Sequence, residues 1–214
     1  MNTLITSLHW DDNPPQIMEK QKKVFDKFGY DIVQTRASIR HPDYMDWIMN
    51  NTSYDRYLFV DSDCIPLSRD VVEEALDKVT NTTKVFGCAQ ATNHLSPEFN
   101  KHIYAAAFFL PLTQDIYNKL GRPSFRETHR SDVAAELTWS AKERQIPVEL
   151  WYPKRSKKDL IWNLGDWGKY GVGSFYGPEG TDEEKVFHLF EIRVSVERGT
   201  LGMFLDECDR VINL

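Results

Sequence analysis

Two aspartates that follow a strand-like stretch have the clearest potential for chemistry. The segment RYLFVDSDCIPL, residues 56–67, runs from five strand-forming residues directly into Asp61-Ser62-Asp63. Two carboxylates one residue apart repel each other unless a positive charge lies between them or water screens them. A divalent ion would supply that charge, and Mg²⁺ and Mn²⁺ prefer oxygen ligands. The spacing therefore predicts a metal site at the end of this strand.

The first hundred residues alternate short apolar strands with helical stretches, as βαβ units do. Pro15 and Gly29 are typical of the start and end of a first helix, and Ser68 of the N-cap of a third. Ligands bind at the carboxyl ends of the strands in such sheets, so the acids that follow strands one and three are expected at one edge. The sequence predicts strands at 3–8, 30–36, 56–60 and 83–92, and helices at 14–29, 41–52 and 68–81.

The second half of the chain changes character. Six glycines between 165 and 180 predict a long mobile loop over 154–185 that closes on a site, or else only irregular connecting structure. Thr113 and Ser131 are the expected N-caps of two helices. The remaining predictions are strands at 103–112, 146–153 and 185–192, and helices at 113–121, 131–145 and 197–213.

Composition excludes several classes of protein. The 214 residues carry a formal charge of −6, so no global basic field exists to hold duplex nucleic acid. The one dense basic patch, 153–158, is either a solvated loop or a clamp for phosphates. Three cysteines without CxxC spacing argue against a disulfide framework or a zinc site. No apolar segment approaches the ~20 residues of a membrane span, and the N-terminus lacks a signal-peptide pattern, so a cytoplasmic location is expected.

Other enzyme classes that place acids after a strand fit the sequence less well. Haloacid-dehalogenase-like phosphatases carry their aspartates on the first strand, with Thr or Val where this chain has Ile65. Polymerase-like nucleotidyltransferases place a Gly-Ser pair before the acids, and none is present here. Sugar nucleotidylyltransferases begin with a glycine-rich phosphate loop, whereas residues 1–16 contain no glycine.

The chain resembles GT-A-fold glycosyltransferases that use nucleotide sugars, and three segments carry the resemblance. YLFVDSDCIPL (57–67) is similar to the family's strand and D-x-D segment, which holds a metal and, through it, the donor diphosphate. HRSDVAAELTWSAKERQIPVELWYP (129–153) is similar to the acceptor-side segment, although Ser131 stands where the family usually has Glu. VFHLF (186–190) is similar to the late strand whose histidine completes the metal shell.

This resemblance implies a fold and an activity. The fold would be a single GT-A-like α/β domain over 1–214, with a mostly parallel mixed central sheet flanked by helices. Residues 1–100 would bind the nucleotide sugar and residues 101–214 the acceptor. The activity would be metal-dependent transfer of a sugar from a nucleoside diphosphate, UDP being the family's usual carrier. The hydroxyl that accepts it would belong to a glycan, a protein or a modified nucleic-acid base.

The resemblance also assigns roles at the reaction centre. Asp61, Asp63 and His188 would bind Mn²⁺ or Mg²⁺, although Asp61 could instead contact the ribose or a metal-bound water, and His188 could be an ordinary core histidine. Asp132 stands where inverting members carry the base that deprotonates the acceptor, and Glu136, one helical turn on, is the alternative.

Further contacts with the two substrates follow from the same resemblance. Trp10 could stack on the base, and the basic residues after 153 could reach the diphosphate. The residues expected to contact the donor are His9, Trp10, Asp11, Arg36, Ser62, Lys154, Arg155 and Lys157. Those expected to contact the acceptor are Trp162, Trp167 and Tyr170. The alternatives are a non-catalytic GT-A-like protein that binds nucleotides or glycans and, with less support, a haloacid-dehalogenase-like phosphatase.

Overall fold

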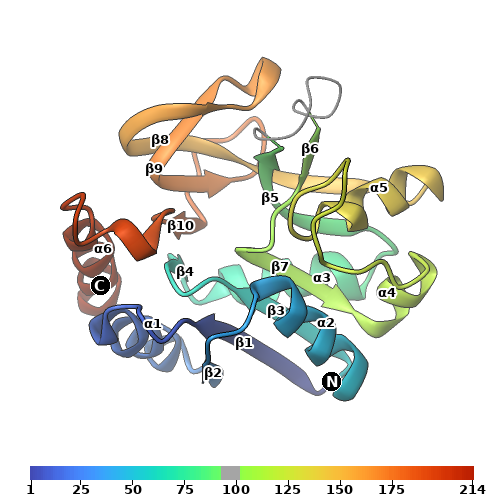
Figure 1. Ribbon diagram of the computed structural model, residues 1–214, viewed down its shortest axis with the longest axis horizontal. Helices are drawn as coiled ribbons and strands as arrows, with labels where there is room; N and C mark the ends of the chain where they lie inside the picture. The colour runs from blue at the N-terminus through green and yellow to red at the C-terminus, as the bar shows by residue number, and fades with distance from the viewer. Residues whose placement is uncertain (93–101) are drawn as a thin grey trace.

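The computed structural model describes residues 1–92 and 102–214 and has a mixed α/β fold built on two sheets (Figure 1). In the first sheet, of order β2-β1-β3-β7, β1 pairs in parallel with β2 and with β3, while β7 runs antiparallel to β3. The strands are β1 (Thr3–His9), β2 (Ile32–Arg36), β3 (Arg56–Val60) and β7 (Phe109–Thr113).

The second sheet has the order β4-β10-β9-β8-β5-β6 and is mainly antiparallel, since only β5 and β8 pair in parallel. Its strands are β4 (Cys64–Pro66), β5 (Val85–Ala91), β6 (Ile103–Ala105), β8 (Val148–Asn163), β9 (Lys169–Gly177) and β10 (Val186–His188). The expected α/β class with mixed strand pairing flanked by helices is confirmed. The expected single, mostly parallel sheet is not, because the described strands form two sheets in which parallel pairing is limited to β2-β1-β3 and β5-β8.

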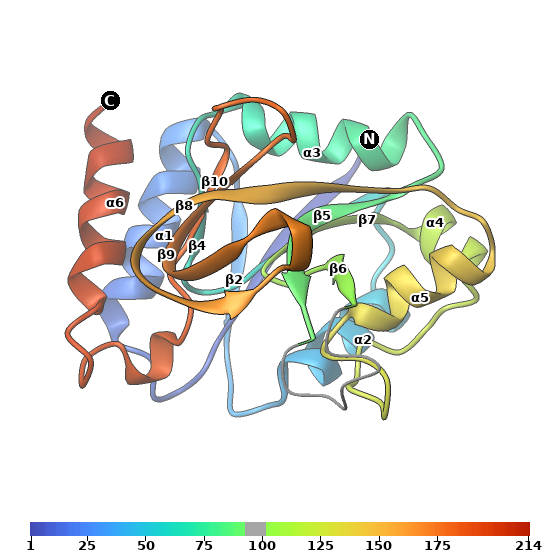
Figure 2. The same cartoon turned by 90° about the horizontal axis from the view of Figure 1, so that it is seen from above.

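Helices flank both sheets. α1 and α6 lie side by side on one flank, and α3 packs against β3, β5 and β7 (Figures 1 and 2). α5 covers β5, β6 and β8 on the other side. The α-helices are α1 (Pro15–Phe28), α2 (His41–Asn51), α3 (Asp70–Thr80), α4 (Gln114–Lys119), α5 (Ala135–Glu143) and α6 (Leu201–Asn213), and the 3₁₀ turns are η1 (Gly165–Trp167) and η2 (Ile192–Val194).

Local sequence explains several helix ends. Pro15 starts α1 because its fixed φ suits the first turn and its missing N–H is not needed there. Gly29 ends the helix at φ 79°, a left-handed conformation that glycine adopts without a Cβ clash. The Thr113 hydroxyl caps α4 by accepting from the backbone N–H of Ile116 at 3.2 Å, as predicted.

Two predicted caps are wrong. The α3 helix begins at Asp70 after Arg69, without a side-chain cap from Ser68. The α5 helix begins only at Ala135, and the residue before it, Ala134, has φ 64°. The Ser131 hydroxyl instead lies 2.8 Å from the hydroxyl of Thr128, because the chain turns once more before the helix starts.

Two predicted segment types are also wrong. The expected strand 103–112 is two strands, β6 and β7, in which β6 pairs with β5 and β7 pairs with β3. The expected loop 154–185 is largely a β-hairpin, because β8 continues to Asn163 and β9 returns antiparallel to it. At the end of β9, a Cβ on Gly177 would overlap the carbonyl oxygen of Glu183, so this glycine serves a close backbone approach.

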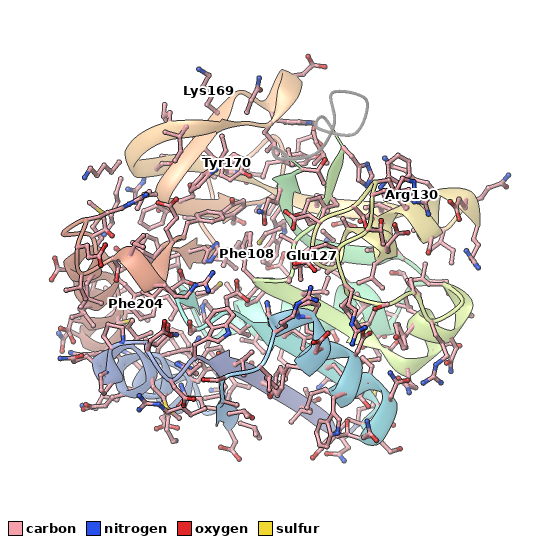
Figure 3. All side chains as sticks on the ribbon, viewed as in Figure 1. Phe108, Glu127, Arg130, Lys169, Tyr170 and Phe204 are labelled. Atoms are coloured by element: carbon pink, nitrogen blue, oxygen red, sulfur yellow. The ribbon has the colours of Figure 1, made fainter. Side chains whose placement is uncertain are left out.

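The core divides into two clusters that meet at β10. Phe187 packs with residues of α1 and α6, including Phe204 (labelled in Figure 3), whereas His188 points to the opposite face of the strand. The larger cluster fills the space between the two sheets and their helices. In the described ranges, no helix is both long enough and apolar enough to cross a membrane.

Candidate metal centre and adjoining cleft

Asp61, Asp63 and His188 come together where β3 ends. The two aspartates belong to the turn between β3 and β4, and His188 ends β10, opposite Cys64 of β4 in the antiparallel register. His188 Nε2 lies 3.1 Å from Asp63 Oδ1 and 3.8 Å from Asp61 Oδ2. One ligand atom of each residue lies within 4.8 Å of the others. This is the set of three that the resemblance implied.

Backbone hydrogen bonds fix the turn that carries the aspartates. The Asp61 N–H donates to the Phe108 carbonyl at 2.9 Å, and the Cys64 N–H donates to the Asp61 carbonyl at 3.0 Å. The buried amide of Gln21, on α1, donates to the carbonyls of Asp61 (2.7 Å) and Cys64 (3.0 Å). The Asp63 carbonyl accepts from the N–H of Leu189, which ties the turn to β10. The turn is therefore held from several sides.

The charges in this group are poorly compensated. Burial raises the pKa of the Asp61 carboxyl, His41 and His188 lower it, and Asp63 raises it further, so the net shift is upward. Asp63 and His188 are both almost fully buried. Two carboxylates this close, one of them buried and the other partly exposed, need a cation beside them to stay ionised.

The donor set fits a divalent ion. Ligand bonds of about 2.1 Å at right angles hold neighbouring ligand atoms roughly 3 Å apart, and the 3.1 Å between His188 and Asp63 matches this spacing. Two carboxylates and one imidazole suit Mg²⁺ or Mn²⁺, and the nitrogen favours Mn²⁺. One feature differs from most metal-binding histidines, since the buried Nδ1 of His188 has no hydrogen-bond partner among the described residues.

Aromatic rings position the His188 imidazole. It stacks on Phe108 at 4.1 Å between centroids and 22° between planes, and it contacts Phe190 at 3.9 Å. Trp162 and Tyr170 also pack on Phe190, at 4.9 Å and 5.6 Å between centroids. Phe108 lies in the middle of the molecule and Tyr170 above it on the hairpin (Figure 3). Two of the expected acceptor contacts, Trp162 and Tyr170, are therefore one ring away from His188.

A cleft of about 650 Å³ opens beside the group. His41 lines it, and the Nε2 atom of His41 lies 3.4 Å from Asp61 Oδ1, so the cleft reaches the first aspartate. The lining comes from the end of β1, the start of α2, the segment before α5 and η2: Trp10, Asp11, Asp12, Ser38, Ile39, Arg40, His41, Pro42, Glu127, Val133 and Arg193.

Within the described part of the chain, one arginine of the cleft has no carboxylate partner. Arg40 forms an ion pair with Glu127. Arg193 makes no ion pair with any described residue, and its guanidinium lies 5.0 Å over the Trp10 ring. The Trp10 indole N–H donates to the carbonyl of Ile39 at 3.0 Å, which fixes the orientation of the ring. The cleft thus offers an aromatic ring and a cation side by side.

Of the five donor contacts expected at the strand ends, some line the cleft and others are buried away from it. Trp10 and Asp11 line the cleft, and Arg36 donates to the Asp11 carbonyl at 2.6 Å just outside it. His9 is only 2% exposed, and its Nε2 lies 3.1 Å from the amide oxygen of Gln21 beneath the metal group. The fifth, Ser62, is also buried, and its hydroxyl accepts a hydrogen bond from the Asn13 amide at 3.1 Å.

The three basic residues expected at the diphosphate are not brought to the cleft. Arg155 forms an ion pair with Glu184 at 2.5 Å, and Lys157 forms one with Glu207 of α6 at 3.0 Å. The Lys154 ammonium donates to the carbonyl of Pro178. Arg155 and Lys157 lie over the rings of Phe175 and Phe187, on the face of the sheet opposite His188. Trp167, expected at the acceptor, stacks on Tyr152 at 3.9 Å instead.

Asp132 and Glu136 have different surroundings. The Asp132 carboxylate accepts from the Val133 N–H at 2.8 Å and from the Tyr104 hydroxyl at 3.1 Å. Its neighbour Val133 lines the cleft, although Asp132 does not. Burial raises the pKa of Tyr104, and the charges of Asp132 and, more weakly, Asp61 raise it further.

Glu136 is engaged in an ion pair. Arg130 donates to it at 2.8 Å and 3.1 Å, and Thr128 donates at 2.8 Å. Burial raises the pKa of the Glu136 carboxyl, but the hydrogen bonds from Arg130, Thr128 and Ser131 outweigh burial and lower it overall. A carboxylate held in this way is a weak proton acceptor.

Several residues at the site were not predicted from the sequence, among them His41, Arg193 and Tyr104. His41 and Arg193 line the cleft, and Tyr104 contacts Asp132. None belongs to a motif. His41 stands before Pro42 at the start of a predicted helix. Residues at helix starts lie at the ligand edge of an α/β sheet, so this position was the available sequence signal for a place at the site.

Comparisons with known proteins do not assign a function to this chain. No protein-family model matches the chain, and no curated protein matches it. Among solved structures, the chain is similar to "Crystal Structure of A197 from STIV", with 9% sequence identity and a TM-score of 0.44, covering 89% of this chain and 95% of that one. The fold and site define a mixed α/β protein with a carboxylate–histidine group at a strand end beside a cleft.

Proposed function

We propose that this protein is a metal-dependent glycosyltransferase that moves a sugar from a nucleoside-diphosphate sugar to an acceptor hydroxyl. One observation carries the proposal. Asp61, Asp63 and His188 converge at the end of β3, beside a cleft whose volume is in the range of small-molecule sites. A bound ion would act as a Lewis acid on the leaving diphosphate.

The cleft residues fit a nucleotide. The Trp10 ring offers a face for a base, and Asp11 and Asp12 offer acceptors for ribose hydroxyls or base N–H groups. Arg193 can bind a phosphate oxygen, because it has no carboxylate to leave among the described residues. Because the Arg193 guanidinium already lies over the Trp10 ring, the guanidinium and a nucleotide base would both contact that ring. UDP is the expected carrier.

On the acceptor side, Asp132 is the better candidate for the base. Hydrogen bonds from the Val133 N–H and the Tyr104 hydroxyl orient its carboxylate, and the neighbouring Val133 lines the cleft. The rival, Glu136, already has an arginine partner. Trp162, which is partly exposed, offers a ring face on which an acceptor sugar could pack, whereas Tyr170 is buried against it.

Thermal unfolding with Mn²⁺ and a panel of nucleoside diphosphates tests the proposal. A ligand that binds only the folded state raises the melting temperature, by the equivalent of about 2.7 kcal/mol at one hundred times its Kd. UDP, GDP, CDP and ADP should stabilise the protein only with the metal, and the best of them identifies the sugar donors to assay for transfer.

Each alternative function predicts a different set of results in the thermal and activity assays. A non-catalytic binding protein would be stabilised by a diphosphate and Mn²⁺ but would not release nucleotide from any nucleotide sugar, with or without acceptors. A haloacid-dehalogenase-like phosphatase would hydrolyse a phosphate monoester through Asp61. Stabilisation of equal size in EDTA would contradict the assignment of Asp61 and Asp63 to a metal.

A further inference from the structure

Asp61 is held by its backbone, and the described residues that contact its carboxylate across the fold are two histidines. Among the described residues, no N–H or O–H group forms a hydrogen bond to either carboxylate oxygen. His188 Nε2 approaches Oδ2 at 3.8 Å, and His41 Nε2 approaches Oδ1 at 3.4 Å. The two imidazoles therefore lie against different oxygens of one carboxylate.

His41 is itself fixed in place. It is the first residue of α2, and the Tyr44 N–H closes the first turn onto the carbonyl of Arg40 at 3.1 Å. Pro42 fixes the backbone next to it. The imidazole meets the Trp10 ring edge-on, with 6.2 Å between centroids and 79° between planes. Only 13% of the side chain is exposed. Little entropy remains to be lost when this ring contacts a carboxylate.

His41 does not belong to the metal-binding set. The ligand atoms that lie within 4.8 Å of one another in the described part of the chain come from Asp61, Asp63 and His188. His41 Nε2 contacts Oδ1 of Asp61, whereas His188 Nε2 approaches the other oxygen, Oδ2. A group in that place cannot share the ion, but it can hold the carboxylate that does.

We propose that His41 is a positioning residue of this metal centre: its Nε2–H group holds Asp61 Oδ1, so that Oδ2 stays turned toward His188 and the ion. The inference rests on the proposed function, because it presupposes that the three ligands bind a metal. The 3.4 Å contact is just beyond the usual range of 2.7–3.2 Å for an N–H···O hydrogen bond, so it acts mainly through the dipole of the N–H group.

The expected loss of metal affinity is taken from groups that orient metal ligands in other proteins. Removing a group that orients a metal ligand typically weakens metal binding by about 10–100-fold. Three variants separate the ring from its N–H group. H41F keeps an aromatic ring against Trp10 without a donor. H41Q reaches the Nε2 position with an amide N–H, and H41N reaches only the Nδ1 position.

The experiment is a calorimetric titration of each variant with Mn²⁺ alone, at one neutral pH and without nucleotide. H129F, which changes an exposed histidine, is the matched control and should bind as the wild type does. We expect H41F and H41N to bind about 10–100-fold more weakly, and H41Q to recover most of the loss. Melting temperatures without metal should agree among the soluble variants, and the Co²⁺ absorption spectrum of H41Q should match that of the wild type.

Wild-type affinity in H41F would overturn the inference. So would equal losses in H41Q and H41N, because the effect would then not depend on where the N–H group lies. An altered Co²⁺ spectrum in H41Q would make His41 a ligand, which also overturns it. If H41F does not fold, the contrast between H41Q and H41N decides. If the wild type binds no Mn²⁺, the proposed function fails as well, which distinguishes the two failures.

Discussion

Replacing His9 by glutamine should remove a defined part of the acid sensitivity of this fold. His9 was expected to touch the donor, but it lies buried beneath the metal group with its Nε2 near Gln21 and Gln34. Burial, with a smaller contribution from Arg36, lowers its pKa from 6.5 to about 4, against the opposing effects of Gln21 and Asp63. The folded protein therefore keeps this imidazole neutral at pH values where the unfolded chain protonates it.

The sign and size of the effect follow from linkage. Because the pKa of His9 is lower in the folded state, its contribution is complete above the unfolded value of 6.5 and is lost as the pH falls toward 4. Between pH 8 and pH 5, this one group should reduce the free energy of unfolding by about 2 kcal/mol. That is a large share of the roughly 5–15 kcal/mol that holds a typical domain folded.

Urea unfolding at these two pH values, followed by tryptophan fluorescence, measures the effect. The H9Q variant cannot titrate, so its loss between pH 8 and pH 5 should be about 2 kcal/mol smaller than that of the wild type. His102, which is also buried and has its pKa lowered to about 4, titrates in both proteins and cancels in the comparison. H129Q is the control for removing an exposed histidine.

Two results would refute this reasoning. If H9Q loses as much stability as the wild type on acidification, His9 is not held neutral in the fold. If H9Q instead loses affinity for a nucleoside diphosphate in the presence of Mn²⁺ while its stability is intact, His9 acts on the donor, as first expected from the sequence. We expect nucleotide affinity to be unchanged, because His9 does not line the cleft.

Three further predictions concern the site and the hairpin. D63N should fold normally but lose the stabilisation by nucleoside diphosphate and Mn²⁺, about 2.7 kcal/mol at one hundred times the wild-type Kd, in a thermal shift assay; retained stabilisation would count against a metal ligand at Asp63. D132N should lower turnover ~10²–10⁴-fold with donor affinity unchanged, whereas E136Q should lower the melting temperature and leave turnover near wild type; the reverse pattern in steady-state kinetics would move the base to Glu136. G177A should destabilise the fold by about 1–3 kcal/mol in urea, because its Cβ would overlap the Glu183 carbonyl, and unchanged stability would mean that the backbone there yields easily.

Local sequence determined the elements that carry the aspartates. The strands and helices predicted from 1 to 92 are all present in the predicted order and nearly within their bounds, because each helix has an apolar stripe and a recognisable start or end; the short strand β4 between β3 and α3 was not predicted. The same local signals placed Asp61 and Asp63 after a buried strand, and the resemblance implied that His188 would join them. The first of these inferences holds because backbone preference depends on neighbours in sequence, whereas the second came from the resemblance and not from a local signal.

Tertiary structure alone decided which side chains meet. Lys157 was expected at the diphosphate, but the antiparallel pairing of β8, β9 and β10 turns it toward Glu207 and away from His188. In the other direction, pairing of β4 with β10 and the start of α2 bring His188 and His41 to the two oxygens of Asp61, across 127 and 20 residues of sequence. Which face a strand residue occupies depends on register and bulges, and register is fixed by pairing between segments distant in the sequence. No local pattern in the sequence contains that information.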